Sequence, residues 1–321
     1  MNIRTLSVLA TSLLLPLAAA SQEFPAKPVT FVVPFAAGSA TDQLARALGQ
    51  SVAEQGKHPV LIDNKPGASG FLAAQQAAKA PADGYTVLIT TNTTHAANEH
   101  LFKSMPYDPV KDFAPVTLLG KGGQIMVVNP NVPAKSVAEF IAYAKANPGK
   151  LNFGSGGPGT TPHLAGEMIK TMAGLQMTHI PYKGGAPALA DLVGGQIQFM
   201  CENIPGTLPF AKSGKLRALA VTDLKRSPLL PELPTLDESG LRGYQIVGWN
   251  GLFVPTGTPP AIVTRLHSAV VGALALPDVK ERLTIMGADG VGDTPQHFAA
   301  FIKAEIPKWA QVVKAAGLKI E

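Results

Sequence analysis

Short apolar runs alternate along the chain with stretches in which apolar residues recur every three or four positions. The first run, residues 29–33, consists of β-branched and aromatic side chains, which is typical of a buried strand. Pro34 ends the run, and a loop of small residues leads to Thr41, after which Leu44 and Leu48 return at helical spacing. The pattern therefore predicts a strand, a small-residue loop and a helix.

The loop at residues 35–40 would enter this helix at its N-terminus. A helix N-terminus leaves backbone N–H groups unpaired and carries the positive end of the helix dipole. Such a loop receives anions. Phosphate-binding and carboxylate-binding proteins both use this geometry, so the stretch predicts the charge of a ligand and leaves its identity open.

The alternation continues along the chain. Further strands are predicted at residues 60–62, 85–90, 125–128, 151–153, 178–181, 196–201 and 216–221. Helices are predicted at residues 71–80, from 136, from 161, at 186–193, at 207–212 and at 295–316. This order indicates parallel sheets, in which ligands lie beyond the carboxyl ends of the strands. The apolar segment 244–254 predicts a strand that crosses back to a first domain, on which we expect the last helix to pack.

The second half of the sequence contains the opening pattern again. Residues 154–160 are rich in Gly and small polar side chains, and Thr161 with Leu164 repeats the spacing of Thr41 with Leu44. Convergence on helix-start chemistry explains this match about as well as duplication does. Either origin predicts two helix starts that can receive an anion, one in each half.

The N-terminus has the organisation of a secretory signal. Arg4 precedes an apolar run at residues 6–17, and three alanines precede Ser21. The run is too short to span a bilayer, and the alanines form an A-x-A cleavage site. We expect residues 1–20 to be a signal peptide that exports the mature chain, with a retained anchor as the alternative.

Charge and cysteine content narrow the class of protein further. The chain of 321 residues has a net charge of +5, which removal of Arg4 with the signal peptide would lower to +4, and its charges of both signs are interspersed. This balance is too mild for a nucleic-acid surface, although it suits small anions. The single cysteine, Cys201, lies in an apolar run, so a buried thiol is favoured over a nucleophile and no disulfide can form within the chain.

Enzyme and metal motifs are incomplete. The stretches 67–70 and 154–156 resemble a serine nucleophile turn, but neither completes G-x-S-x-G, and no phosphate or dinucleotide fingerprint follows the first strand. His95 and His100 are five residues apart and diverge on a helix, so with Glu99 they favour a solvated turn or helix start over a metal site. We therefore predict no cofactor and no metal.

Two further side chains have open roles. His163, two residues after Thr161, could bond a ligand carboxylate or cap its own helix. Lys183 follows a predicted strand and could add positive charge to the cleft or be solvated.

Several segments together resemble a known family. They are Val33-Pro34-Phe35 with Gly38, Thr41 and Asp42; residues 64–68; residues 80–86; residues 155–160 with 163–167; residues 181–184; residues 194–196; and residues 214–220. In this order they resemble the periplasmic substrate-binding receptors of tripartite tricarboxylate transporters, often called Bug proteins. The resemblance covers essentially the whole mature chain.

The resemblance implies an α/β protein with the type II periplasmic binding-protein fold, in which crossing strands join two α/β domains and the ligand cleft lies between them. Domain 1 would comprise residues 21–123 and 253–321. Domain 2 would comprise residues 124–252, crossing strands included.

The resemblance also implies site residues. One wall would be formed by Phe35, Gly38, Ser39, Ala40, Thr41 and Asp42, with Ala68 and Ser69 nearby. The other would be formed by Ser155, Gly156 and Thr160, with His163 as a further candidate. Thr91, Lys183 and Glu202 complete the predicted ligand-binding set.

Two departures from the family pattern affect the ligand. The loop at residues 36–40 is Ala-Ala-Gly-Ser-Ala where the family usually has Pro-Pro-Gly-Gly-Gly, which leaves open whether any position there needs a positive φ. Glu202 stands where the family has Asp. A longer acid changes the shape of the pocket, so the identity of the ligand does not transfer.

These observations predict a periplasmic solute receptor that binds a small carboxylate, with no covalent chemistry. The ligand would be a di- or tricarboxylate, an amino acid or an aromatic acid, taken up or sensed. The partner would be a tripartite tricarboxylate transporter complex in the membrane or a sensor protein, and we expect a monomer that does not bind nucleic acid. The alternatives are a secreted hydrolase-like enzyme using the same cleft and a cytoplasmic acid-sensing module, against which the signal peptide counts.

Overall fold

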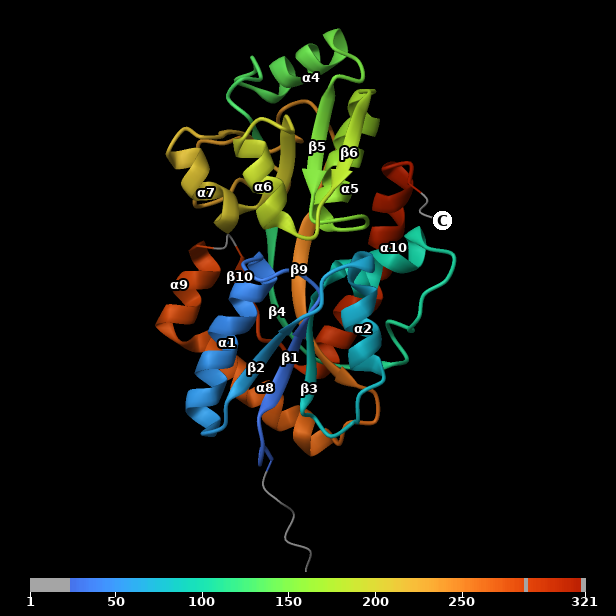
Figure 1. The fold of residues 1–321 in the computed structure, drawn as a ribbon, viewed down its shortest axis with the longest axis vertical. Coiled ribbons are helices and arrows are strands. Elements are labelled where there is room, and N and C mark those ends of the chain that lie inside the picture. The colour runs from blue at the N-terminus through green and yellow to red at the C-terminus, as the bar shows by residue number, and fades with distance from the viewer. Residues whose placement is uncertain (1–23, 286–287, 319–321) are drawn as a thin grey trace, which may run out of the picture.

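The computed structural model describes residues 24–285 and 288–318. Two lobes lie one above the other along the long axis of the molecule, and two long strands run from one lobe into the other (Figure 1). The predicted signal peptide lies outside the described residues.

The first lobe contains a parallel three-stranded arrangement. Its strands are β1 (Val29–Val33), β2 (Val60–Asn64) and β3 (Thr86–Thr91), with β1 in the middle. Its helices in this part are α1 (Ala40–Gly56), the 3₁₀ turn η1 (Ala68–Gly70), α2 (Phe71–Ala78), the π-helical turn η2 (Thr93–Ala97) and α3 (Asn98–Leu101). Phe31 and Val33 pack with α1, whereas Val32 packs with α2, which is why β1 is apolar on both faces.

The second lobe repeats the arrangement. Its strands are β5 (Leu151–Ser155), β6 (Met177–Pro181), β7 (Phe199–Asn203) and β8 (Arg217–Val221). Its helices are α4 (Val137–Ala146), α5 (Thr161–Ala173), α6 (Gly185–Val193) and α7 (Ile204–Lys212). Strand β5 pairs in parallel with β6 and β7, as the alternating sequence pattern predicts.

The crossing strands are β4 (Phe113–Val128) and β9 (Val247–Pro255), which pair antiparallel from Phe113 opposite Pro255 to Gly123 opposite Val247. Strand β9 also pairs with β3, while β4 continues into the second lobe and pairs with β7 and β8. The two lobes therefore share one sheet, in the order β2-β1-β3-β9-β4-β7-β5-β6.

The crossing strand expected near residues 244–254 is present as β9. Strand β4 was predicted only over residues 125–128, because Gly120, Lys121, Gly122 and Gly123 interrupt its apolar pattern. The predicted change of domain between residues 123 and 124 falls inside β4, and the domain limits stay a prediction.

The C-terminal segment returns to the first lobe. It forms α8 (Pro260–Ala275), α9 (Pro277–Ile285), β10 (Asp289–Gly290) and α10 (Pro295–Ala315). Helix α8 packs on α1, and α10 packs on η2 and β4, as expected for a helix of the first domain. Helix α10 also contacts α5 of the second lobe.

Glu305 fixes α10 to the crossing strands. Its Oε2 atom accepts hydrogen bonds from the indole Nε1 atoms of Trp249 on β9 and Trp309 on α10, each at 3.1 Å. Its Oε1 atom accepts a 2.7 Å bond from Lys308 Nζ. All of the indole bonding therefore depends on one buried carboxylate.

Replacing Glu305 by Ala should lower the free energy of unfolding by roughly 2–5 kcal/mol, because two buried indole N–H groups lose their acceptor. Glu305→Gln keeps an acceptor oxygen and should lose less than half as much. Chemical denaturation of both variants, with the exposed Lys303→Ala as control, measures the difference. A loss below about 1 kcal/mol in Glu305→Ala would contradict this role.

Candidate functional site

A cavity of about 340 Å³ lies between the lobes. The first lobe contributes the start of α1 and the residues after β3, and the second contributes the starts of α5 and α6 and the end of β7. Residues 121–124 of β4 and 248–250 of β9 line it between the lobes. The cavity therefore lies at the carboxyl ends of the parallel strands, where ligands bind in such sheets.

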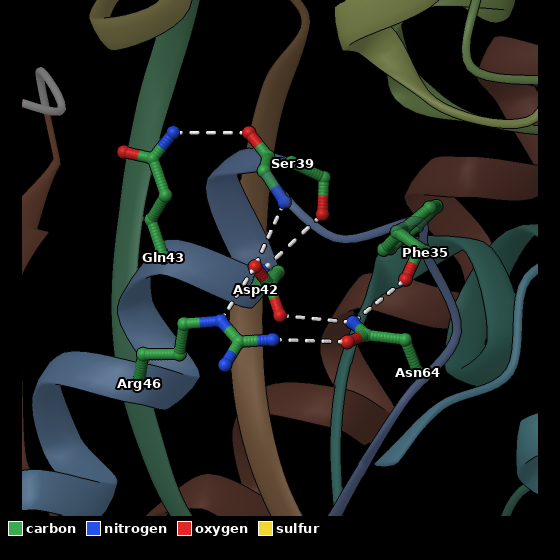
Figure 2. A network of polar contacts seen from close by, with 7 residues as sticks. Phe35, Ser39, Asp42, Gln43, Arg46 and Asn64 are labelled. Atoms are coloured by element: carbon green, nitrogen blue, oxygen red, sulfur yellow. Dashed lines mark hydrogen bonds and ion pairs between the residues drawn. The ribbon is translucent and has the colours of Figure 1, made fainter. Parts of the chain in front are cut away.

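The start of α1 is held by its own side chains (Figure 2). Ser39 is the N-cap, and its Oγ atom accepts a 3.3 Å bond from the backbone N–H of Asp42. Within the loop only Gly38 has a positive φ, of 84°. The absence of glycine at positions 39 and 40 thus introduces no backbone strain, which answers the question that the sequence left open.

Asp42 is buried outside the lining of the cavity and holds the loop in place. Its carboxylate accepts bonds from Gly38 N at 2.8 Å, Arg46 Nε at 3.0 Å and Asn64 Nδ2 at 2.9 Å. The amide of Asn64 also donates to Phe35 O at 3.0 Å, so one network spans the loop (Figure 2). Burial raises the pKa of Asp42, but these hydrogen bonds outweigh it and the net pKa lies below its usual value.

The start of α5 is built differently. Thr160 is the N-cap, but its hydroxyl donates to Gly157 O at 2.7 Å and does not cap the helix. Ser155 Oγ bonds both the N–H and the carbonyl of Gly157, each at 3.1 Å. These bonds close the loop on itself and leave the first turn of α5 facing the cavity at Thr160, Thr161 and Pro162.

Two histidines support this loop, the buried His163 and the half-buried His179. The ring of His163 stacks on that of His179 at 3.9 Å, and His163 Nδ1 accepts a 3.0 Å bond from Gly159 N. Burial, together with neighbouring positive groups, lowers the pKa of His163 to about 3 and that of His179 to about 4. Both rings are therefore neutral near pH 7 and act as packing and hydrogen-bonding groups.

The predicted site residues fall into two groups. Those that line the cavity are Phe35, Gly38, Ser39, Ala40, Thr41, Thr91, Gly156, Thr160 and Glu202. Those outside the lining are Asp42, Ser155 and His163, which are buried behind it, Ala68 and Ser69, which form η1 with positive φ, and Lys183, which is exposed. The role of each residue in ligand binding stays a prediction.

Sequence reasoning missed several residues that line the cavity. Asn92 and Thr93 directly follow the third strand, and their polar character could have assigned them to the site. Gln124 and Asn250 lie within the crossing strands, where the local pattern gives no sign of which residues face the cavity.

Glu202 is the one carboxyl group among the described residues that line this cavity. Its Oε1 atom accepts a 2.8 Å bond from Asn203 N, and burial raises its pKa to about 7. A Cβ atom at Gly185 would collide with Glu202 Oε2, so the carboxyl fits only against a glycine at the start of α6. The preceding Cys201 is buried, and burial raises the pKa of its thiol, as expected for an unreactive cysteine.

The prediction of a solvated segment at His95 was wrong. His95 is fully buried in η2, where its ring stacks on Phe253 at 3.9 Å and its Nδ1 atom lies 2.8 Å from Thr94 Oγ1. Burial lowers its pKa to about 3. In the described part of the chain, no group of three or more His, Cys, Asp or Glu residues is arranged to hold a metal ion.

Ser155 is the serine whose surroundings most resemble those of a hydrolase nucleophile. Its Oγ atom lies 2.6 Å from His179 Nε2, which is the spacing of a nucleophile and its base. Ser155 is, however, fully buried and outside the cavity lining. A substrate in the cavity therefore does not reach this hydroxyl.

Two α/β lobes that share crossing strands and enclose a cavity define a solute-binding protein of the type II periplasmic class. Within residues 24–285 and 288–318, none of the helices has the length and apolar character needed to cross a bilayer.

The family model described as Tripartite tricarboxylate transporter family receptor matches residues 44–318. Protein BugT of Bordetella pertussis (strain Tohama I) is 36% identical over 299 residues, which cover 93% of this chain and 92% of BugT. The chain belongs to this receptor family, the Bug-type periplasmic solute-binding proteins.

Two solved structures are similar over almost the whole chain. Rpa4515 of R. palustris with adipate has a TM-score of 0.90 and 40% identity, covering 93% of this chain and 100% of that chain. MatC (Rpa3494) from Rhodopseudomonas palustris with bound malate has a TM-score of 0.86 and 37% identity, covering 90% and 100%. The resemblance expected from the sequence motifs is thus confirmed.

The buried histidines predict a pH-dependent stability. In the unfolded chain each takes up a proton below about pH 6.5, whereas the folded rings stay neutral. Above pH 6.5 these rings should therefore have no effect on how the free energy of unfolding varies with pH. As the pH drops below 6.5, the free energy of unfolding should decrease by up to about 1.4 kcal/mol per pH unit for each ring.

His95→Gln should reduce this slope between pH 6.5 and 5, measured by urea denaturation, while His58→Gln, which changes a partly exposed ring, should not. Equal slopes in the wild type and His95→Gln would show that His95 is not the neutral buried group that the structure indicates.

Proposed function

We propose that this protein is an extracytoplasmic receptor that binds a small carboxylate in the cavity between its lobes. The observation that carries the proposal is the meeting of two helix N-termini, those of α1 and α5, at one cavity. Helix N-termini favour anions. The adipate bound to Rpa4515 and the malate bound to MatC are both carboxylates, which supports a ligand of this kind.

Binding would use oriented uncharged donors. Apart from Lys121 and Glu202, the cavity-lining residues that the structure describes carry no charge. Each hydrogen bond from an N–H group or hydroxyl to a carboxylate contributes on the order of 1.5–3 kcal/mol, so a few such bonds offset the cost of removing the carboxylate from water.

The crossing strands provide a route for closure. Gly122, Gly123 and Gly248 lie in β4 and β9 between the lobes, where the backbone can change its φ and ψ angles most easily. A hydrogen bond also joins the two lobes directly. Thr161 Oγ1 at the start of α5 donates to Asn92 Oδ1, which follows β3, at 3.0 Å. Closure would bring the donors of both lobes onto one ligand.

Export and partners belong to the same proposal. Residues 1–20 would be removed as a signal peptide, and the mature protein would act in the periplasm as a monomer. It would deliver its ligand to a tripartite tricarboxylate transporter complex in the membrane or present it to a sensor protein. An enzyme using this cavity is the alternative. Of the two serines that the sequence offered for it, Ser155 is buried, and neither Ser155 nor Ser69 is among the residues that line the cavity.

A screen of mono-, di- and tricarboxylates, amino acids and aromatic acids should identify at least one that binds the mature protein saturably and without turnover. Thermal-shift measurements find the acids, and calorimetry gives the dissociation constant and stoichiometry. Stoichiometric product formation, or no binding by any of these acids, would contradict the proposal.

Glu202 should make dicarboxylate binding depend on pH. Below about pH 7 its carboxyl is protonated and neutral, and above it the charge repels a second carboxylate in the same cavity. The dissociation constant of a bound dicarboxylate should therefore rise between pH 6 and 8, by at most tenfold per pH unit.

Glu202→Gln should remove most of this dependence in calorimetric titrations, whereas Glu232→Gln, an exposed carboxyl of the second lobe, should retain it. If the profile of Glu202→Gln matches that of the wild type, Glu202 does not face the ligand.

A further inference from the structure

A second cavity, of about 410 Å³, also has walls from both lobes. The first lobe lines it with residues 301, 305 and 308 of α10, and the second lobe with residues 225–229, in the loop that follows β8. Between them lie residues 121–123 of β4 and residues 247 and 249 of β9. Pockets of this volume bind small organic molecules. We call it the second cavity, and the ligand cavity between α1 and α5 the first.

The second cavity lies against one face of the crossing strands. Lys121 pairs with Trp249 and Gly123 pairs with Val247, and since side chains alternate along a strand, these four positions share a face. All four line the second cavity. The first cavity extends to the opposite face, where three alternate positions line it and do not line the second: Gln124, Gly248 and Asn250. The crossing strands therefore form a wall between the two cavities.

The acidic groups of the second cavity are already bonded within the protein. Glu305 accepts from two indoles and from Lys308 Nζ. Asp223 Oδ1 accepts from Gln245 Nε2 at 3.1 Å and from the N–H of Leu224 at 2.7 Å. Both carboxylates thus have structural partners.

The basic groups exceed the acidic ones. The described lining has the two carboxylates named above and four basic side chains, those of Lys121, Lys225, Arg226 and Lys308. Arg226 pairs with Glu238 and Lys308 with Glu305. Among the described residues, Lys121 and Lys225 have no ion-pair partner. Two exposed ammonium groups, one on a crossing strand and one on the second lobe, therefore favour an anion in this cavity.

Apolar side chains form the rest of the wall. Leu229, Val247 and Phe301 line the second cavity and are only partly buried, so their apolar surface is accessible. A ligand that covers this surface and also carries a negative charge uses both features. Such a ligand is an organic anion with an apolar body.

The position of the second cavity couples it to the first. Bending the crossing strands so that the lobes approach over the first cavity moves them apart over the opposite face. A ligand that contacts α10 and the loop after β8 together is therefore favoured when the lobes are separated over the first cavity. A ligand can shift such an equilibrium only by its differential affinity for the two states, and this ligand has one.

We propose that the second cavity binds an amphipathic organic anion, such as an aromatic sulfonate or carboxylate, and that its occupancy weakens binding in the first cavity. The negative group lies near Lys121 and Lys225, and the apolar body lies against Val247 and Phe301. Because linkage is reciprocal, a ligand in the first cavity weakens binding in the second by the same factor. This inference goes beyond the proposed function, in which the second cavity takes no part.

Binding is tested with 8-anilinonaphthalene-1-sulfonate, an aromatic anion whose fluorescence rises in apolar surroundings. Titration into the mature protein, without any acid, should show one saturable site. Lys225→Glu should raise the dissociation constant of the probe by about fivefold or more. Lys215→Glu changes an exposed lysine outside the lining of both cavities, and it should change this constant by less than about twofold. Equal dissociation constants in the wild type and Lys225→Glu would overturn the inference.

Coupling is tested by calorimetry with the tightest-binding acid of the screen. As the probe is added, the dissociation constant of the acid should rise to a plateau about threefold or more above its starting value, and saturating acid should raise that of the probe by the same factor. In Lys225→Glu the rise should need more probe. A constant that does not change would overturn the inference. So would one that rises without a plateau and equally in Lys225→Glu, because that is competition within the first cavity.

A crystal structure with the probe tests the site without a variant. The inference expects a sulfonate oxygen within about 4 Å of Lys121 Nζ or Lys225 Nζ, and a probe found in the first cavity alone would overturn it. Neither this structure nor the probe titration needs an acid. Failure of every acid in the screen would therefore remove the proposed function, while these two tests would still decide the inference.

Discussion

The antiparallel pairing of β4 with β9 is the constraint on which the rest of the structure depends. Through this pairing, the strands of the first lobe and those of the second lobe form one sheet. Because every parallel strand ends toward this junction, the loops that follow β1, β3, β5 and β7 meet at one cavity. The bond network of Glu305, Trp249 and Trp309 fixes α10 to the same strands, so the junction is also where the C-terminal helix is anchored.

Several polar side chains around this junction are used to hold the protein's own loops in place. The carboxylate of Asp42 is used to hold the α1 loop, and the hydroxyls of Ser155 and Thr160 close the α5 loop. Asn92 also has a structural role, because its Oδ1 atom accepts a bond from Thr161 Oγ1 and so joins the two lobes. An uncharged set of donors suits a receptor, because a ligand bound by hydrogen bonds and helix N-termini can be released again when the lobes separate.

Much of the fold could be predicted because its signals are local. The apolar run of β1 and the Ser39 and Asp42 helix start lie within 14 residues of sequence, and each has a direct physical meaning. The first part of β4 could not be predicted, because its glycines and Lys121 do not form a strand pattern in the sequence. They lie in a strand because they pair with β9, which is distant in sequence. The burial of His95 likewise depends on Phe253, and the position of Gln124 in the cavity depends on the junction of strands distant in sequence.

The central claim is that both lobes bind one carboxylate between them. Hydrogen–deuterium exchange with and without the tightest-binding acid tests it most directly. We predict that the ligand slows exchange together at the start of α1, at residues 38–44, and at the start of α5, at residues 157–165, while α4 at the far end of the second lobe is unchanged. Protection confined to one lobe would contradict the account.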